Sequence, residues 1–177
     1  IDLLNIPDTV ETIEENAFAS SYFKAVNLSN SITKIASSLF SSSKIENVII
    51  PDSVEIIEDS AFRASEIRSV TIGTGVTTIS DSIFEYCDQF TTVHYTGTPE
   101  KFEAIQVDEE DNDIFFSADV HYMDADDVKE ASSVPTCTED AHTSGYYCDQ
   151  CDVLVTGKIL DFALGHDWSS TTGVCDV

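Results

Sequence analysis

The stretch Ile45-Glu-Asn-Val48-Ile-Ile50-Pro-Asp-Ser-Val54-Glu-Ile-Ile57-Glu-Asp-Ser-Ala61-Phe62 recurs along the chain at a spacing of 22 residues. Four columns of apolar residues keep this spacing: Phe18, Phe40, Phe62 and Phe84; Ile13, Ile35, Ile57 and Ile79; Val10, Ile32, Val54 and Val76; Ile6, Leu28, Ile50 and Ile72. A fixed period of this size is the signature of a solenoid, in which each unit buries its apolar face against its neighbours. Residues 1–98 are therefore predicted to form a repeat array.

Each unit also shows the internal pattern of a short strand. In Ile45-x-x-Val48-x-Ile50 the alternation places two apolar residues on one face, which predicts short parallel strands stacked into a ribbon. A second segment, Val54-x-x-Ile57 and its equivalents, predicts another short strand or turn that closes the coil. The fourth unit is one residue longer and contains Cys87, which we interpret as a small buried packing residue.

The outward positions of the predicted ribbon are small and mostly uncharged. They are Ala25, Asn27, Asn47, Ile49, Ser69, Thr71, Thr92 and His94. Stacked strands hold such side chains in a rigid array, and solenoids present surfaces of this kind to partners. We take these eight residues as the candidate binding face for a protein ligand, with His94 expected to point to solvent. The competing interpretation is that small residues are present because adjacent strands crowd them.

The charge of the chain narrows the classes of partner. Its 177 residues include 33 acidic and 8 basic side chains, a formal net charge of −25. Such a chain repels nucleic-acid phosphates and anionic lipid surfaces, so neither is an expected partner. No apolar run approaches the length of a membrane span, so membrane insertion of this chain is not expected either.

Residues 99–123 have the composition of a cap that closes the array. Pro99 suits the first turn of a short helix, with Phe102 and Ile105 on one face. The segment 118–122 alternates as a last strand.

An acidic run at residues 108–113 lies within this predicted cap. Asp108, Glu110 and Asn112 alternate as calcium ligands do, but the run lacks the glycine that a calcium-loop turn needs. We therefore favour a solvated acidic segment over a calcium loop.

The remainder reads as a linker, residues 124–135, followed by a small cysteine/histidine module, residues 136–177. A module of this size needs a staple, because its hydrophobic core is too small to fold alone. Cys148, Cys151, His166 and Cys175 are candidate zinc ligands, which would make zinc the one expected cofactor. Disulfides, including one through Cys137, or free thiols are the alternatives, and the spacing does not decide between them.

No catalytic motif is present. The four histidines, His94, His121, His142 and His166, lie in no recognisable nucleophile or H-E-x-x-H arrangement, and the seven glycines form no phosphate-binding loop. We therefore expect a protein that is not an enzyme.

The repeat resembles a known family. The units I-P-x-S/T-V-x-x-I-x-x-x-A-F followed by L-x-x-V-x-I are similar to the BspA-like (Treponema-type) leucine-rich repeats of bacterial surface proteins. The fourth unit, with its cysteine three residues after Phe84, is the closest to that pattern, whereas the first three lack that cysteine and one residue. The tail elements C-x-x-C and L-G-H-D-W also resemble small modules at the ends of bacterial surface proteins.

This resemblance implies a leucine-rich-repeat solenoid, mainly of β-structure, at the cell surface or outside the cell. It further implies recognition or adhesion, with host or matrix proteins as partners. A structural spacer and an accessory domain of a larger secreted protein or enzyme are the alternative functions. Because Ile1 already falls inside a repeat, and because the tail module looks truncated, we expect the natural protein to extend beyond both ends.

Overall fold

The computed structural model describes residues 3–123, 128–130, 141–142, 146–151, 153–156 and 159–161. The chain divides into two compact units, Ile1–Asp124 and Ala125–Val177. Each unit has its own sheets, with three in the first and two in the second among the described residues.

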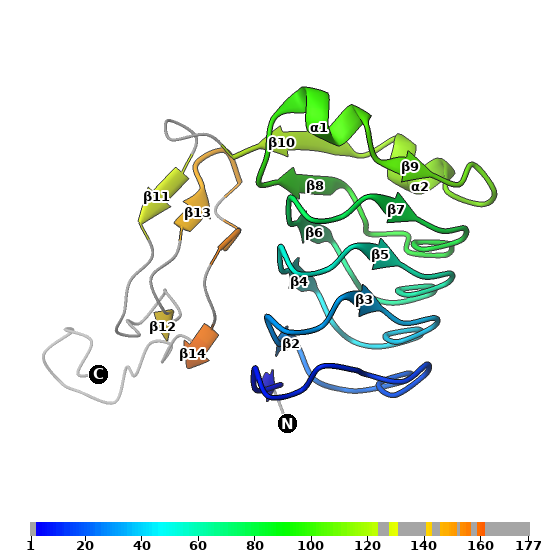
Figure 1. Cartoon of the computed structure of the whole chain (residues 1–177), viewed down its shortest axis with the longest axis vertical. Helices are drawn as coiled ribbons and strands as arrows, with labels where there is room; N and C mark the ends of the chain where they lie inside the picture. The colour runs from blue at the N-terminus through cyan, green and yellow to red at the C-terminus, as the bar shows by residue number, and fades with distance from the viewer. Residues whose placement is uncertain are drawn as a thin grey trace, which may run out of the picture. The chain divides into compact units, whose positions relative to one another are not determined.

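The first unit is a solenoid whose turns each contribute a strand to a parallel ribbon (Figure 1). These strands are β1 (Leu3–Asn5), β2 (Ala25–Asn27), β4 (Asn47–Ile50), β6 (Ser69–Ile72), β8 (Thr92–Tyr95) and β10 (Asp119–Tyr122). β1 pairs with β2, and β4, β6, β8 and β10 form a second sheet in that spatial order, always parallel. The predicted solenoid and its stacked strands are therefore confirmed.

A third sheet, also parallel, closes each coil. It consists of β3 (Lys34–Ile35), β5 (Ile56–Ile57), β7 (Thr78–Ile79) and β9 (Gln106–Val107). Ile35, Ile57 and Ile79 point into the core, and the residue before each of them points outward. The segments after Val54 and its equivalents, expected to form a short strand or a turn, form short strands, and β9 extends their sheet into the cap.

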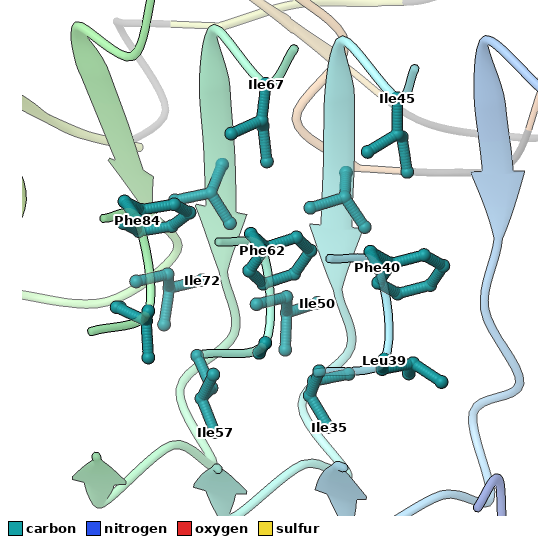
Figure 2. Close-up of a cluster of buried hydrophobic side chains, with 14 of the residues drawn as sticks. Ile35, Leu39, Phe40, Ile45, Ile50, Ile57, Phe62, Ile67, Ile72 and Phe84 are labelled. Carbon is teal, nitrogen blue, oxygen red and sulfur yellow. The ribbon is translucent and has the colours of Figure 1, made fainter. Parts of the chain in front are cut away.

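The core is organised around a column of stacked phenylalanine rings (Figure 2). The ring centroids are 5.7 Å apart between Phe18 and Phe40, 5.5 Å between Phe40 and Phe62, and 5.5 Å between Phe62 and Phe84. The cap continues this column, because Phe115 stacks on Phe84 at 6.2 Å with only 18° between the ring planes. We refer to these five rings as the phenylalanine ladder.

The tight turns between the two sheets use left-handed backbone at regular positions. Positive φ angles of 54° to 60° occur at two positions in each turn: Asn16, Ser38, Ser60 and Ser82; and Ser20, Ser42, Ala64 and Tyr86. None of these residues is glycine, although a side chain in this region costs about 1–2 kcal/mol. The turns are held by hydrogen bonds to the next coil, such as Ala64 N to Glu85 O at 2.7 Å.

The cap contains two short helices, α1 (Pro99–Glu103) and α2 (Asp113–Phe116). Pro99 occupies the first turn of α1, as its fixed φ angle and missing N–H predict. Phe102 packs against Tyr95, with ring centroids 5.2 Å apart, and against Tyr122, at 6.0 Å. The predicted helix and final strand of the cap are both present.

Asn112 joins the acidic segment to the last turn of the array. Its side chain is buried, and its Oδ1 accepts a hydrogen bond from Ile83 N at 3.1 Å. Its Nδ2 donates to Ser80 O at 2.8 Å and to Asp108 O at 2.7 Å. All three hydrogen bonds of the amide go to backbone groups, so Asn112 has a structural role in the cap.

The extra residue of the fourth unit is absorbed in a turn. Ser69 pairs with Thr92, a step of 23 residues, whereas Asn47 pairs with Ser69, a step of 22. Cys87 lies in the longer turn and is buried, with its Sγ donating to Phe62 O at 3.1 Å. Burial raises the pKa of its thiol, which agrees with an unreactive packing role.

In the second unit, the described residues form two antiparallel strand pairs. β11 (Val128–Glu130) pairs with β13 (Tyr146–Cys148), and β12 (Ala141–His142) pairs with β14 (Ile159–Asp161). Val128–Glu130 lies within the stretch we interpreted as a linker, so this part of it is a strand. Val-Lys-Glu contains no residue typical of turns. The strand that pairs with it lies 16 or more residues away in the sequence.

We predict that Phe62→Ala lowers the free energy of unfolding by about 3–5 kcal/mol, because it removes a fully buried ring and leaves a cavity in the middle of the ladder. Denaturant-induced unfolding followed by circular dichroism measures this loss. The matched control is Phe116→Ala, since Phe116 is 55 % exposed and should cost at most about 0.5 kcal/mol. Equal losses in the two variants would contradict a dominant role for the ladder.

We predict that Ala64→Gly raises the stability by up to about 1 kcal/mol. It relieves a φ angle of 57° while adding only the smaller entropy cost of one glycine in the unfolded chain. Ala61→Gly in the same turn is the control and should be destabilising, because Ala61 is fully buried in the core. A fall in melting temperature for Ala64→Gly would show that the left-handed backbone is not a source of strain.

We predict that Asn112→Ala destabilises the chain by about 1–3 kcal/mol, because the N–H of Ile83 is left buried without its acceptor. Hydrogen exchange of the Ile83 amide measures the local effect and denaturant titration the global one. Asn112→Asp retains an acceptor for Ile83 but loses the donor to Ser80 and Asp108, so it should also be destabilising. Unchanged exchange at Ile83 in Asn112→Ala would refute this role.

Candidate binding face of the strand ribbon

The outward side chains of the ribbon form two columns that run across the strands. Asn47, Ser69, Thr92 and Asp119 are register partners in one column, and Ile49, Thr71, His94 and His121 in the other. The alternate residues of the same strands, such as Val48 and Ile50, point into the core. We call the outward side chains of β4, β6, β8 and β10, together with the equivalent residues of β1 and β2, the ribbon face.

Polar side chains on the ribbon face bond to one another between turns. Ser69 Oγ donates to Asn47 Oδ1 at 2.7 Å, and Asn27 Nδ2 donates to Asn5 Oδ1 at 2.5 Å. Each bond joins the same position in adjacent turns, 22 residues apart. The face is therefore cross-linked along the ribbon, which reduces the side-chain entropy that a bound partner would otherwise have to remove.

The structure brings six of the eight predicted face residues together on one sheet. Asn47, Ile49, Ser69, Thr71, Thr92 and His94 all lie on β4, β6 and β8. Ala25 and Asn27 lie on β2, which pairs with β1 in a separate sheet. The coils on either side of this break remain joined just before the strands, where Lys44 N donates to Ser21 O at 2.9 Å and Glu46 N to Lys24 O at 3.3 Å.

Exposure differs along the ribbon face. Asn47 is exposed, and Ile49 and Thr92 are half-buried. Five of the predicted residues are buried in the full chain: Ala25, Asn27, Ser69, Thr71 and His94. The amide of Asn47 and the aliphatic side chain of Ile49 are therefore among the groups of the ribbon face that a partner can contact.

His94 points outward from the sheet, in the column of Ile49 and Thr71, but the expectation that it is exposed to solvent is wrong. His94 is fully buried, and its ring packs edge-on against that of His121 on the neighbouring strand, with centroids 5.3 Å apart. Burial, and secondarily the neighbouring His121, lower the pKa of His94 to about 4. The sequence carried a signal for this pair that we did not use, because Val93-His94-Tyr95 is repeated as Val120-His121-Tyr122.

Four of the five basic side chains of the array, all except Lys24, form ion pairs between turns. Lys34 contacts Glu58 at 2.7 Å, Arg63 contacts Glu85 at 2.6 Å and Arg68 contacts Glu46 at 3.6 Å; Lys44 pairs with Glu66. The hydrogen bond from Arg63 lowers the pKa of Glu85. The chain carries 33 acidic and only 8 basic side chains, so most of its carboxylates have no basic side chain to pair with.

The candidate zinc ligands fall partly outside the described residues. Cys148 is buried at the end of β13, Cys151 is exposed in the turn that follows, and their Sγ atoms lie within 4.8 Å of each other. The turn closes through a hydrogen bond from Cys148 N to Val153 O at 2.9 Å. His166, Cys175 and Cys137 lie outside the described residues, so the full ligand set stays a prediction.

Among the residues that the structure describes, neither helix reaches the length and apolar character needed to cross a membrane.

Comparison with known proteins identifies the family of the repeat. A family model described as the BspA type leucine rich repeat region matches residues 1–107 with six copies. This match continues past residue 98, where we placed the end of the array, and takes in β9. No curated protein matches the chain.

A solved structure supports the same assignment. The chain is similar to a leucine-rich cell surface protein from Faecalibacterium prausnitzii A2-165, with 27 % sequence identity and a TM-score of 0.56. The likeness covers 62 % of this chain and 30 % of that protein, so this chain corresponds to less than a third of the length of that protein. Because the family model matches more than half of the chain, this protein belongs to the BspA-type leucine-rich repeat family.

Proposed function

We propose that this chain is a recognition module of a bacterial cell-surface or secreted protein, and that it binds a protein ligand through the ribbon face without catalysing a reaction. The observation that carries this proposal is the in-register pair of columns on β4, β6 and β8, in which small uncharged side chains are held by a continuous sheet. Preorganised side chains lose little conformational entropy when a partner binds. Family membership favours the same function, since repeat solenoids commonly present extended surfaces to partners.

The location at the cell surface rests on the relatives. The similar protein from Faecalibacterium prausnitzii is a leucine-rich cell surface protein, and the acidic composition of this chain suits an exposed, highly soluble module. The ligand class we propose is an extracellular protein of the host or of the matrix. The net charge of −25 on the chain favours a partner with a neutral or basic contact area.

The centre of the proposed contact is Ile49 with Asn47 beside it. Ile49 is the one aliphatic side chain in its column on the β4–β10 sheet. It lies on the edge strand β4, opposite Thr71 on β6. A half-buried aliphatic residue surrounded by polar groups has the composition of a contact centre enclosed by a polar rim. Asn47 supplies an exposed amide next to it.

We predict that Asn47→Lys/Ile49→Glu weakens binding by about tenfold or more, since the new charges must be desolvated at the centre of the contact. Binding is measured by surface plasmon resonance against a panel of purified extracellular-matrix and host-surface proteins. The matched control is Ile56→Glu/Thr78→Lys, which introduces the same residues at outward positions of β5 and β7, in the β3–β5–β7–β9 sheet. Circular dichroism and melting temperature confirm that both variants fold.

The competing function is a structural spacer that holds another domain away from the cell. A spacer uses neither sheet for recognition, so both double variants would then bind the panel equally well or the unaltered chain would bind none of it. Loss of binding in the ribbon variant alone supports recognition. Equal loss in both variants would indicate a general electrostatic effect and would refute a role for the ribbon face.

A further inference from the structure

Two histidines lie side by side at the place where the repeat array meets its cap. His94 on β8 and His121 on β10 are direct register partners in the parallel sheet. Their ring centroids are 5.3 Å apart with 77° between the ring planes, and one ring nitrogen of each lies within 4.8 Å of one in the other. The pair belongs to the outward column of the ribbon face, where the turns before it carry Thr71 and Ile49.

The spacing of the two rings is close to that of two ligands on one metal ion. Nitrogens bound to a tetrahedral zinc ion at about 2.0–2.1 Å lie about 3.3–3.4 Å from each other. The two nitrogens lie within 4.8 Å of each other, and to reach the metal-bound separation the two side chains must rotate about χ1 and χ2. The strands need not move, because register fixes the two Cα atoms opposite each other.

His94 is also in a suitable state for ligation. Its ring hydrogen-bonds to the backbone of Val70 on the adjacent strand β6, where the carbonyl acts as the acceptor. Metal-bound histidines commonly donate one ring N–H to such a carbonyl, which fixes the tautomer and leaves the other nitrogen as the ligand.

We propose that His94 and His121 form a binding site for a divalent transition metal of the zinc, nickel and copper class, with water or other donor groups completing the coordination. Neutral imidazole selects this class over magnesium and calcium, which prefer oxygen ligands. One histidine comes from the last repeat strand and the other from the strand of the cap. A bound metal therefore ties the cap to the array and fixes the end of the ribbon face.

The test is titration of the full chain with Zn²⁺ by isothermal calorimetry, comparing the unaltered chain with His121→Ala and His94→Ala. Each histidine variant should weaken zinc binding by about tenfold or more, since each loses a direct ligand. His142→Ala, which removes a histidine from β12 in the second unit, is the matched control and should leave the affinity unchanged.

A second readout keeps the test valid if His94→Ala fails to fold. In the unaltered chain labelled with ¹⁵N-histidine, Zn²⁺ should shift the imidazole signals of His94 and His121, and Mg²⁺ or Ca²⁺ should not. Zinc should also raise the melting temperature of the unaltered chain more than that of His121→Ala, because a ligand that binds the folded state stabilises it by mass action.

The cysteine variant Cys148→Ser/Cys151→Ser separates this pair from the cysteine turn of the second unit. If zinc binding is lost in the cysteine variant but unchanged in both histidine variants, the metal is held without the histidines and the proposal is wrong. Unshifted imidazole signals at saturating zinc would overturn it as well. Weakened binding in His121→Ala with shifted His94 and His121 signals would establish both residues as ligands.

Discussion

The stacking of one phenylalanine from each turn is the interaction on which the rest of the structure depends. Adjacent rings in the array are 5.5–5.7 Å apart and nearly parallel, within 21°. That separation is only slightly larger than the roughly 4.7–4.9 Å between neighbouring strands of a sheet. The rings can stack because each turn repeats the last with a small translation, and the hydrogen-bonded strands on both sides set the size of that translation. A change in the length of one turn must therefore be absorbed away from the ladder.

The fourth turn shows how such a change is absorbed. Its extra residue lies in the segment that carries Cys87, between Phe84 and the strand β8. Phe62, Phe84 and Phe115 remain stacked, and all four residues of β6 keep their partners on β8. Cys87 occupies the position of Ser65 one turn earlier, and its thiol bonds to Phe62 O of that turn, so the added residue lies between Cys87 and β8. Insertions in the turns are thus compatible with an unbroken core.

Repetition decided which features could be predicted from the sequence. The strand around Val48 and Ile50 and the ladder through Phe62 were predictable because the same apolar pattern recurs in several units at one spacing. Features that occur once were not: the buried amide of Asn112, and the strand Val128–Glu130 inside an apparent linker. The burial of His94 was missed for a related reason. Its partner His121 comes after the array, at a spacing of 27 residues, where the regular period no longer applies.

The same repetition separates the residues that hold the fold from those that are free to vary. Inward positions keep Val and Ile from turn to turn, because each must fit the turn above and below it. Outward positions change freely, and one column of the ribbon face runs from Ile49 through Thr71 to His94 and His121. The chemistry of the face therefore shifts from aliphatic and hydroxyl groups on the array to imidazole beside the cap. A protein contact centred on Ile49 and a metal held by the histidines use different turns of one rigid sheet, so either could change without disturbing the other.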